Sequence, residues 1–117
     1  MPARSRTFEE VGVWQKAHAL VLAIYRFSAT FPQHETFGLR SQLRRSVTSV
    51  PANFAEGFKK RGYSDKLRFY NIAQGSLEES RYYLLLARDL GYGETRSLLD
   101  SVDEVARMLH AYMTAVA

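Results

Sequence analysis

The sequence contains no cysteine among its 117 residues, which excludes disulfide bonds and thiolate metal ligands. It has no apolar run near the ~18 residues that a membrane-spanning helix needs. The first ten residues lack the apolar stretch of a secretory signal peptide. Strand-like alternation of apolar and polar residues between turn signals is absent as well. A chain of this length and composition predicts one α-helical domain, residues 1–117, in the cytoplasm.

The usual sequence signals of an enzyme site are also missing. Di-metal sites in helical bundles use Glu-x-x-His pairs, but none of the three histidines has a glutamate three positions before it. The seven glycines are scattered and form no phosphate-binding loop. We therefore expect no catalytic residue, no metal and no cofactor.

Apolar residues recur at three- and four-residue steps in four segments, which predicts four amphipathic helices. The segments cover residues 11–30, 36–58, 64–90 and 94–116. Pro32 is expected to end the first helix, and Gly91 to end the third as a left-handed residue. Thr36 and Ser64 are the expected N-caps of the second and third helices. Short connections favour an all-α, antiparallel up-down-up-down four-helix bundle.

Each of the four segments has an expected buried face. The first face comprises Val13, Ala17, Leu20, Ile24, Phe27 and Phe31, widened by Trp14, Val21 and Tyr25. The second comprises Leu39, Leu43, Val47 or Val50, Phe54 and Phe58. The third comprises Phe69, Ala73, Ser76, Ser80, Tyr83 and Ala87, and its small residues favour close helix packing. The fourth comprises Leu98, Val102, Val105, Leu109, Tyr112 and Val116. A second line of Leu99, Ala106 and Met113 serves either as core or as a subunit contact.

Pro51 lies in the middle of the second segment. It removes one backbone donor and crowds the carbonyl of Val47, which costs ~3 kcal/mol or more in a straight helix. Two alternatives follow, a single helix kinked at Pro51 or two helices separated there. We favour the kinked helix, because the apolar steps continue in phase across the proline.

The net charge of +4 is unevenly distributed. Residues 40–68 hold eight basic and two acidic residues, a balance of +6, and the rest of the chain has a balance of −2. A concentrated basic region is typical of proteins that bind polyanions, although lysine and arginine also keep helix surfaces soluble. The expected nucleic-acid contacts are Arg40, Arg44, Arg45, Lys59, Lys60, Arg61, Tyr63, Lys66 and Arg68. Tyr63 is placed either to stack on an unpaired base or to close the loop as part of the core.

Polar residues on the outer side of the second segment form a second candidate feature. Asn53 and Glu56 lie close in helical angle to Arg45. A half-buried carboxylate normally pairs with an arginine or a hydroxyl group, so we expect a structural polar network, with a functional polar site as the alternative. Its expected members are Arg45, Asn53, Glu56, Glu78 and Glu79.

Several short motifs keep a characteristic order along the chain. They are Val13-Trp14-Gln15-Lys16-Ala17, Gln42-Leu43-Arg44-Arg45-Ser46, Val50-Pro51-Ala52-Asn53, Ala55-Glu56-Gly57, Gly75-Ser76-Leu77-Glu78-Glu79 and Leu90-Gly91-Tyr92. In this pattern the chain resembles the small S23-like proteins encoded in intervening sequences of bacterial 23S ribosomal RNA genes. Phe54 stands where that family usually has isoleucine.

The resemblance implies a four-helix bundle related in fold to the accessory protein of diversity-generating retroelements, a ring-like pentamer whose basic surface binds nucleic acid. It implies no catalytic residue. The leading interpretation is a non-catalytic homo-oligomer, a pentamer, that serves as a binding or scaffold module and contacts RNA or DNA, with no membrane partner. The alternatives are a protein–protein adaptor with no nucleic-acid role and an enzyme with an unrecognised site.

Overall fold

A computed structural model describes residues 5–117, and these residues form four α-helices, two short 3₁₀ turns and no strand. The 3₁₀ turns are η1 (Phe8–Glu10) and η2 (Gln33–Glu35). The helices are α1 (Gly12–Ser28), α2 (Leu39–Lys59), α3 (Tyr63–Asp89) and α4 (Arg96–Ala115). The prediction of an all-α fold with four helices is confirmed, while residues 1–4 of the expected domain lie outside the described part.

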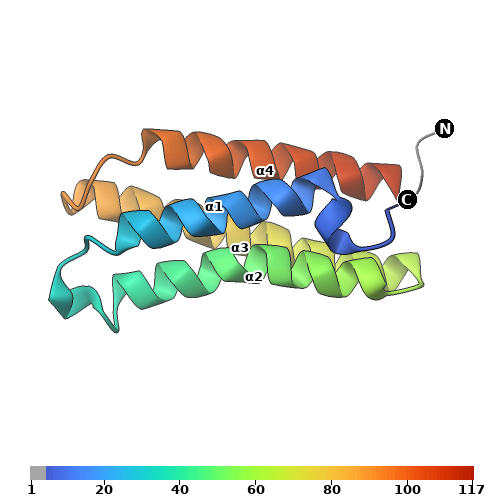
Figure 1. The fold of residues 1–117 in the computed structure, drawn as a ribbon, viewed down its shortest axis with the longest axis horizontal. Helices are drawn as coiled ribbons and strands as arrows, with labels where there is room; N and C mark the ends of the chain where they lie inside the picture. The colour runs from blue at the N-terminus through green and yellow to red at the C-terminus, as the bar shows by residue number, and fades with distance from the viewer. Residues whose placement is uncertain (1–4) are drawn as a thin grey trace.

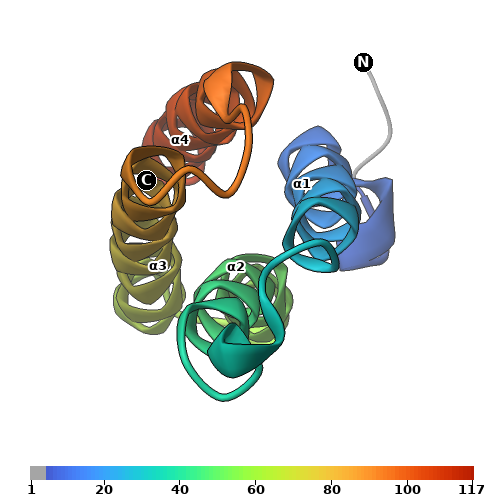
Figure 2. The ribbon, with the colours of Figure 1, turned by 90° about the vertical axis from the view of Figure 1, so that its left-hand side faces the viewer.

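The four helices pack lengthwise into a body of 48 × 24 × 19 Å. The α1–α2 and α3–α4 connections lie at one end of this body, and the α2–α3 connection lies at the other (Figure 1). Seen along the long axis, α1 contacts both α2 and α4, and α3 contacts α2 and α4 (Figure 2). Apolar side chains from all four helices meet in one core. No helix within residues 5–117 combines the length and the apolar character needed to cross a bilayer.

α2 is a single helix that continues through Pro51. The alternative of two separate helices is therefore wrong. Val47, Val50 and Phe54 are all buried, on both sides of the proline. The burial of this continuous apolar face offsets the loss of one backbone hydrogen bond at Pro51.

The start of α2 differs from the expectation. Thr36 is not the N-cap, because its hydroxyl donates to the carbonyl of Gln33 (2.7 Å) within η2. Instead the carboxylate of Glu35 accepts a hydrogen bond from the Leu39 amide (2.9 Å), one of the donors that a helix start leaves free. The hydroxyl of Tyr92, from the α3–α4 loop, donates to the other oxygen of Glu35 (2.7 Å). The Glu35 carboxylate thus caps the start of α2 and links the α1–α2 loop to the α3–α4 loop.

The start of α3 also differs from the expectation. Gly62 is the N-cap residue, and its backbone is extended. Ser64 is therefore not a cap, since it already lies inside the first helical turn, where its hydroxyl cannot reach the amides that a cap satisfies. No side chain of the described residues caps this helix start.

The buried face of α3 is wider than predicted. Ala73, Ser76, Ser80 and Ala87 are buried as expected, but Phe69 and Tyr83 are only half-buried. The largest buried side chains of this helix are instead Tyr70, Leu77 and Leu84. The reason is that α3 packs against both α2 and α4, so it needs two adjoining faces.

Serine hydroxyls fill the contact between α2 and α3. Ser46 and Ser80 lie 2.9 Å apart, and Ser76 donates to Ser49 (2.8 Å). Each hydroxyl therefore has a partner, and the small side chains let the two helices approach closely. The expectation of close packing from the small residues of α3 is confirmed.

Gly91 ends α3 as predicted, with φ at +79°. The amide of Tyr92 donates to the carbonyl of Ala87 (2.9 Å), and the amide of Gly91 donates to that of Arg88 (3.0 Å). This is the Schellman pattern, in which a left-handed glycine lets the chain satisfy the last carbonyls of the helix. On α4 the predicted face is buried or half-buried, and the second line of Leu99, Ala106 and Met113 packs on the core.

Replacing Glu35 by glutamine should lower the melting temperature at pH 7 by more than at low pH. Hydrogen bonds from the Leu39 amide and then from the Tyr92 hydroxyl hold the pKa of Glu35 below its ordinary value of 4.5. Folding therefore favours the ionised carboxylate, and this contribution is complete above that ordinary pKa and disappears as the pH falls through the lower pKa of the folded state. Thermal denaturation followed by circular dichroism at pH 7 and at acidic pH measures the difference.

Glu56→Gln is the matched control for this experiment, because Glu56 is exposed and makes no hydrogen bond or ion pair within residues 5–117. Its melting temperature should follow that of the wild type at every pH. A Glu35→Gln difference that stays constant from neutral to acidic pH would contradict the assigned role of the carboxylate.

Candidate nucleic-acid interface

The nine candidate contact residues lie in two groups near opposite ends of the bundle. Arg40, Arg44 and Arg45 lie on the first turns of α2, and we call them the arginine group. Lys59, Lys60, Arg61, Tyr63, Lys66 and Arg68 lie at or after the α2–α3 turn, and we call them the turn group. With a rise of 1.5 Å per residue, Arg44 and Lys59 are separated by about 22 Å along α2. The balance of +6 is therefore not one continuous patch.

The turn group contains three consecutive exposed positive charges. Lys59, Lys60 and Arg61 are consecutive and exposed, and none of them forms an ion pair within the described part of the chain. Lys59 is the last residue of α2, and the backbone of Lys60 is extended, so Lys60 and Arg61 lie beyond the helix. Three adjacent cations without an acidic partner make a local positive potential that attracts anions.

The other members of the turn group have mixed roles. Lys66 Nζ donates to the carbonyls of Phe58 (2.8 Å) and Gly57 (3.3 Å), so it caps the end of α2. Burial lowers the pKa of this amine. Lys60 and Arg68 lie 5.2 and 5.4 Å from the centre of the Phe69 ring, within the range of a cation–π contact.

Tyr63, the first residue of α3, is 43% exposed and lies outside the core cluster. The alternative that it closes the loop as part of the core is therefore wrong. Tyr63 follows the three consecutive cations by two residues in the sequence and leaves its ring free to stack on a base.

Two members of the arginine group hold the end of α1. Arg40 donates from Nε to the carbonyl of Ser28 (2.9 Å) and from Nη2 to that of Phe31 (2.7 Å). Arg44 donates from Nε to the Ser28 hydroxyl (2.8 Å) and from Nη2 to the carbonyl of Tyr25 (3.1 Å). These bonds add a second donor to the Ser28 and Tyr25 carbonyls in the last turn of α1 and tie α2 to the loop that follows α1. No local sequence signal could have found this role, because the partners lie 9 to 19 positions away in the chain.

Arg45 faces the other way, toward α3. Its guanidinium pairs with the carboxylate of Glu79, which also accepts a hydrogen bond from the Tyr83 hydroxyl (2.8 Å). The hydrogen bond to this carboxylate raises the pKa of Tyr83, with burial and the charge of Glu79 acting in the same direction. Because Glu79 partly neutralises its charge, Arg45 attracts an anion less strongly than its exposed position alone would indicate.

The structure brings together only part of the predicted polar network. Arg45 and Glu79 are paired, but Asn53 donates to the carbonyl and hydroxyl of Ser49 on its own helix (both 2.9 Å). Glu78 pairs with Arg81 (3.2 Å) on α3. Glu56 is exposed and reaches none of these residues. Helical angle alone could not predict this, since Arg45 and Glu56 are three turns apart on α2.

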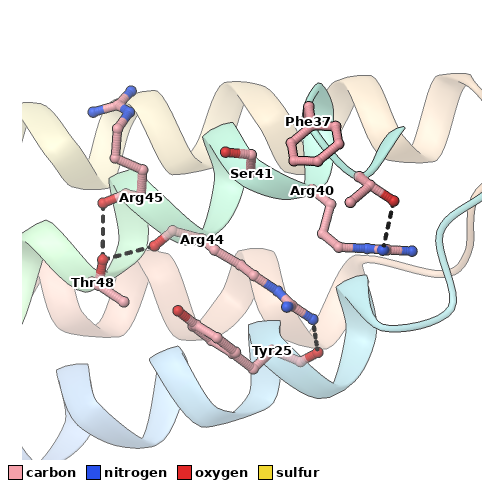
Figure 3. A pocket seen from close by; sticks show the side chains of 8 residues that line it. Tyr25, Phe37, Arg40, Ser41, Arg44, Arg45 and Thr48 are labelled. Atoms are coloured by element: carbon pink, nitrogen blue, oxygen red, sulfur yellow. Dashed lines mark hydrogen bonds between the residues drawn. The ribbon is translucent and has the colours of Figure 1, made fainter. Parts of the chain in front are cut away.

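An open pocket of about 450 Å³ lies beside the arginine group (Figure 3). It is lined by Tyr25, Thr36, Phe37, Arg40, Ser41, Arg44, Arg45 and Thr48. The prediction that Tyr25 belongs to the core is wrong, because this residue is 40% exposed. The Cζ atom of Arg44 lies over the Tyr25 ring, 4.4 Å from the centre of the ring. Sequence analysis missed Phe37, which is 94% exposed.

A second, apolar groove of about 300 Å³ runs between α1 and α2. It is lined by Phe8, Trp14, His18, Val21, Thr48, Pro51, Ala52 and Ala55. Trp14 and His18 stack in it with ring centres 5.0 Å apart. No group of three or more acidic or histidine residues that could hold a metal ion occurs within residues 5–117.

Three comparisons relate this geometry to known proteins. The family model of the 23S rRNA-intervening sequence proteins matches residues 9–111. No curated protein matches the chain. A crystal structure of a protein of unknown function from the S23 ribosomal protein family of Bacteroides thetaiotaomicron superposes with a TM-score of 0.77 at 24% sequence identity, over 86% of this chain and 97% of that one. This structural likeness supports the fold.

Proposed function

The chain belongs to the family of 23S rRNA-intervening sequence proteins, and from this premise we propose that it is a non-catalytic, homo-oligomeric binding or scaffold protein of the cytoplasm that contacts RNA or DNA. The observation that carries this proposal is the exposed run of Lys59, Lys60 and Arg61 without an acidic partner in the described residues. Consecutive cations without an acidic partner bind phosphates by charge and need no base-specific contact.

Aromatic residues next to these cations support a nucleic-acid ligand over a small anion. Tyr63 is exposed beside them, and Phe69 lies under Lys60 and Arg68. Lysine and arginine bind phosphates, while exposed rings stack on unpaired bases, and the two together are typical of surfaces that bind single strands.

We also infer that the protein is a pentamer of antiparallel up-down-up-down bundles in which α2 bends at Pro51. The pentamer is inferred from the relation in fold that we expect between S23-like proteins and the accessory protein of diversity-generating retroelements. The alternation of the connections between the two ends supports the helix directions (Figure 1). The apolar groove between α1 and α2 offers a surface for a neighbouring subunit. Five copies of the turn group would act together and raise the affinity through multivalency.

A salt titration tests the proposed function. Binding of the wild-type protein to fragments of 23S ribosomal RNA and to single-stranded DNA should weaken linearly on a log–log plot, with a slope of about −0.7 for each phosphate that a cation neutralises. Fluorescence anisotropy gives the affinities, and light scattering gives the oligomer mass with and without RNA. Absence of binding at low salt would refute the nucleic-acid role and favour a protein–protein adaptor whose turn group meets an acidic partner.

A further inference from the structure

We propose that the pocket beside the arginine group binds one nucleotide of a single-stranded nucleic acid, with Phe37 stacked on its unpaired base and Arg44 in contact with its phosphate. This inference rests on the proposed function and adds to it a second contact point, at the end of the bundle away from the turn group. A strand held at both places would run along α2 between the two ends.

Phe37 is the first argument. It lies in the turn between η2 and α2 and is 94% exposed, more than any other large apolar side chain of the described residues. An aromatic ring left in water gains no packing energy for the fold, so the stability of the bundle does not explain why it is present. Every nucleic-acid base has a flat face, and an exposed ring at a fixed turn is a stacking platform for it.

The charges that surround this ring are the second argument. Arg40, Arg44 and Arg45 line the pocket together with four side chains that carry a hydroxyl group, and no carboxylate is part of its lining. Arg44 points toward Tyr25, whereas Arg45 points to the opposite side of α2 (Figure 3). Arg45 is paired with Glu79, and Arg40 already makes three hydrogen bonds, so Arg44 keeps the most N–H donors for a ligand.

The orientation of Arg44 is the third argument. Its Nε and Nη2 are held by the Ser28 hydroxyl and the Tyr25 carbonyl, and the Tyr25 ring supports one face of the group. A guanidinium has five N–H donors, so these two bonds leave three for a ligand. Because the side chain is already fixed, binding a phosphate costs little further conformational entropy.

The size of the pocket favours a single unpaired nucleotide. Its volume of about 450 Å³ lies within the range of sites for small ligands. In a duplex each base is already covered on both faces by its neighbours, so it offers no face to Phe37, whereas the bases of a single strand are free to stack on protein rings. The pocket should therefore bind single strands and not duplexes.

Phe37→Ala tests the inference, because this exposed ring can be removed without opening a cavity in the core. Anisotropy should be measured with a short RNA, a DNA of the same sequence and the corresponding duplex. The substitution should weaken binding of both single strands by roughly 5- to 100-fold, while duplex binding stays unchanged. The matched control is Tyr82→Ala, which removes a 59% exposed ring of α3 outside the pocket and should leave every affinity unchanged.

The outcomes separate this inference from the proposed function. If the wild-type protein binds single strands and Phe37→Ala binds them equally well, the pocket assignment is overturned while the turn group remains a nucleic-acid contact. If light scattering shows that Phe37→Ala loses subunits, the ring belongs to a subunit contact and the assignment is again overturned. If the wild-type protein binds no nucleic acid at low salt, both the pocket assignment and the proposed function are refuted. If RNA alone responds to Phe37→Ala, the ligand is RNA.

Discussion

Replacing Lys59, Lys60 and Arg61 together by glutamine should weaken binding to single-stranded nucleic acid about 100-fold at 0.1 M salt, because three cations contribute about two units to the log–log salt slope. The slope itself should become flatter by the same two units. The melting temperature should change little, since all three side chains are exposed and make no ion pair within residues 5–117. Anisotropy across a range of salt concentrations measures the affinity and the slope together.

A second triple variant controls for net charge. Arg26, Arg96 and Arg107 are exposed residues of α1 and α4, outside both groups. Their replacement by glutamine removes the same total charge from other surfaces of the bundle. If this control weakens binding as much as the turn variant, attraction by the overall charge explains the affinity, and the turn group has no special role.

Phe54→Ala should destabilise the fold by about 3–5 kcal/mol, the usual cost of removing a fully buried phenylalanine. Phe54 on α2 is 2% exposed, and its ring centre lies 5.2 Å from that of Tyr70 on α3 and 5.1 Å from that of Tyr112 on α4. Its removal opens a cavity where three helices meet. For a chain of this length the loss corresponds to a fall of roughly 10–20 °C in melting temperature.

Phe54→Leu is the matched control for the core, because leucine retains most of the apolar volume and should cost clearly less. Denaturant unfolding followed by circular dichroism gives both free energies. If Phe54→Ala and Phe54→Leu lower the free energy of unfolding equally, the cost does not come from a cavity, and the aromatic cluster does not join the three helices as described.

The spacing of apolar residues predicted the helices, because helix formation depends largely on residues that are close together in the sequence. An apolar side chain every third or fourth residue must face one side of a helix, and this held even across Pro51, where Val50 and Phe54 remain on the buried side. Gly91 was predictable for the same reason, since its left-handed backbone is a property of one residue and its neighbours.

The helix starts and the roles of the arginines were not predictable, because their causes are distant in sequence. Glu35 begins α2 with the help of Tyr92, 57 positions later. Arg40 and Arg44 look like free surface cations in the sequence, yet they bind carbonyls of the preceding helix and loop. The sum of the charges along the chain cannot show which basic side chains already bind a partner. It also cannot show that the length of α2 separates the arginine group from the turn group.

The hydrogen bond between Tyr92 and Glu35 has a consequence for how the chain folds. Contacts between consecutive helices involve residues close in sequence, and such local topologies fold in microseconds to milliseconds. Distant segments must meet where α1 approaches α4, where Phe54 of α2 contacts Tyr112 of α4, and where Tyr92 joins the α3–α4 loop to the α1–α2 loop. We therefore expect the helical hairpins to assemble early and the ring of four helices to close last, so that amide hydrogens of α1 and α4 exchange with solvent before those along the α2–α3 contact.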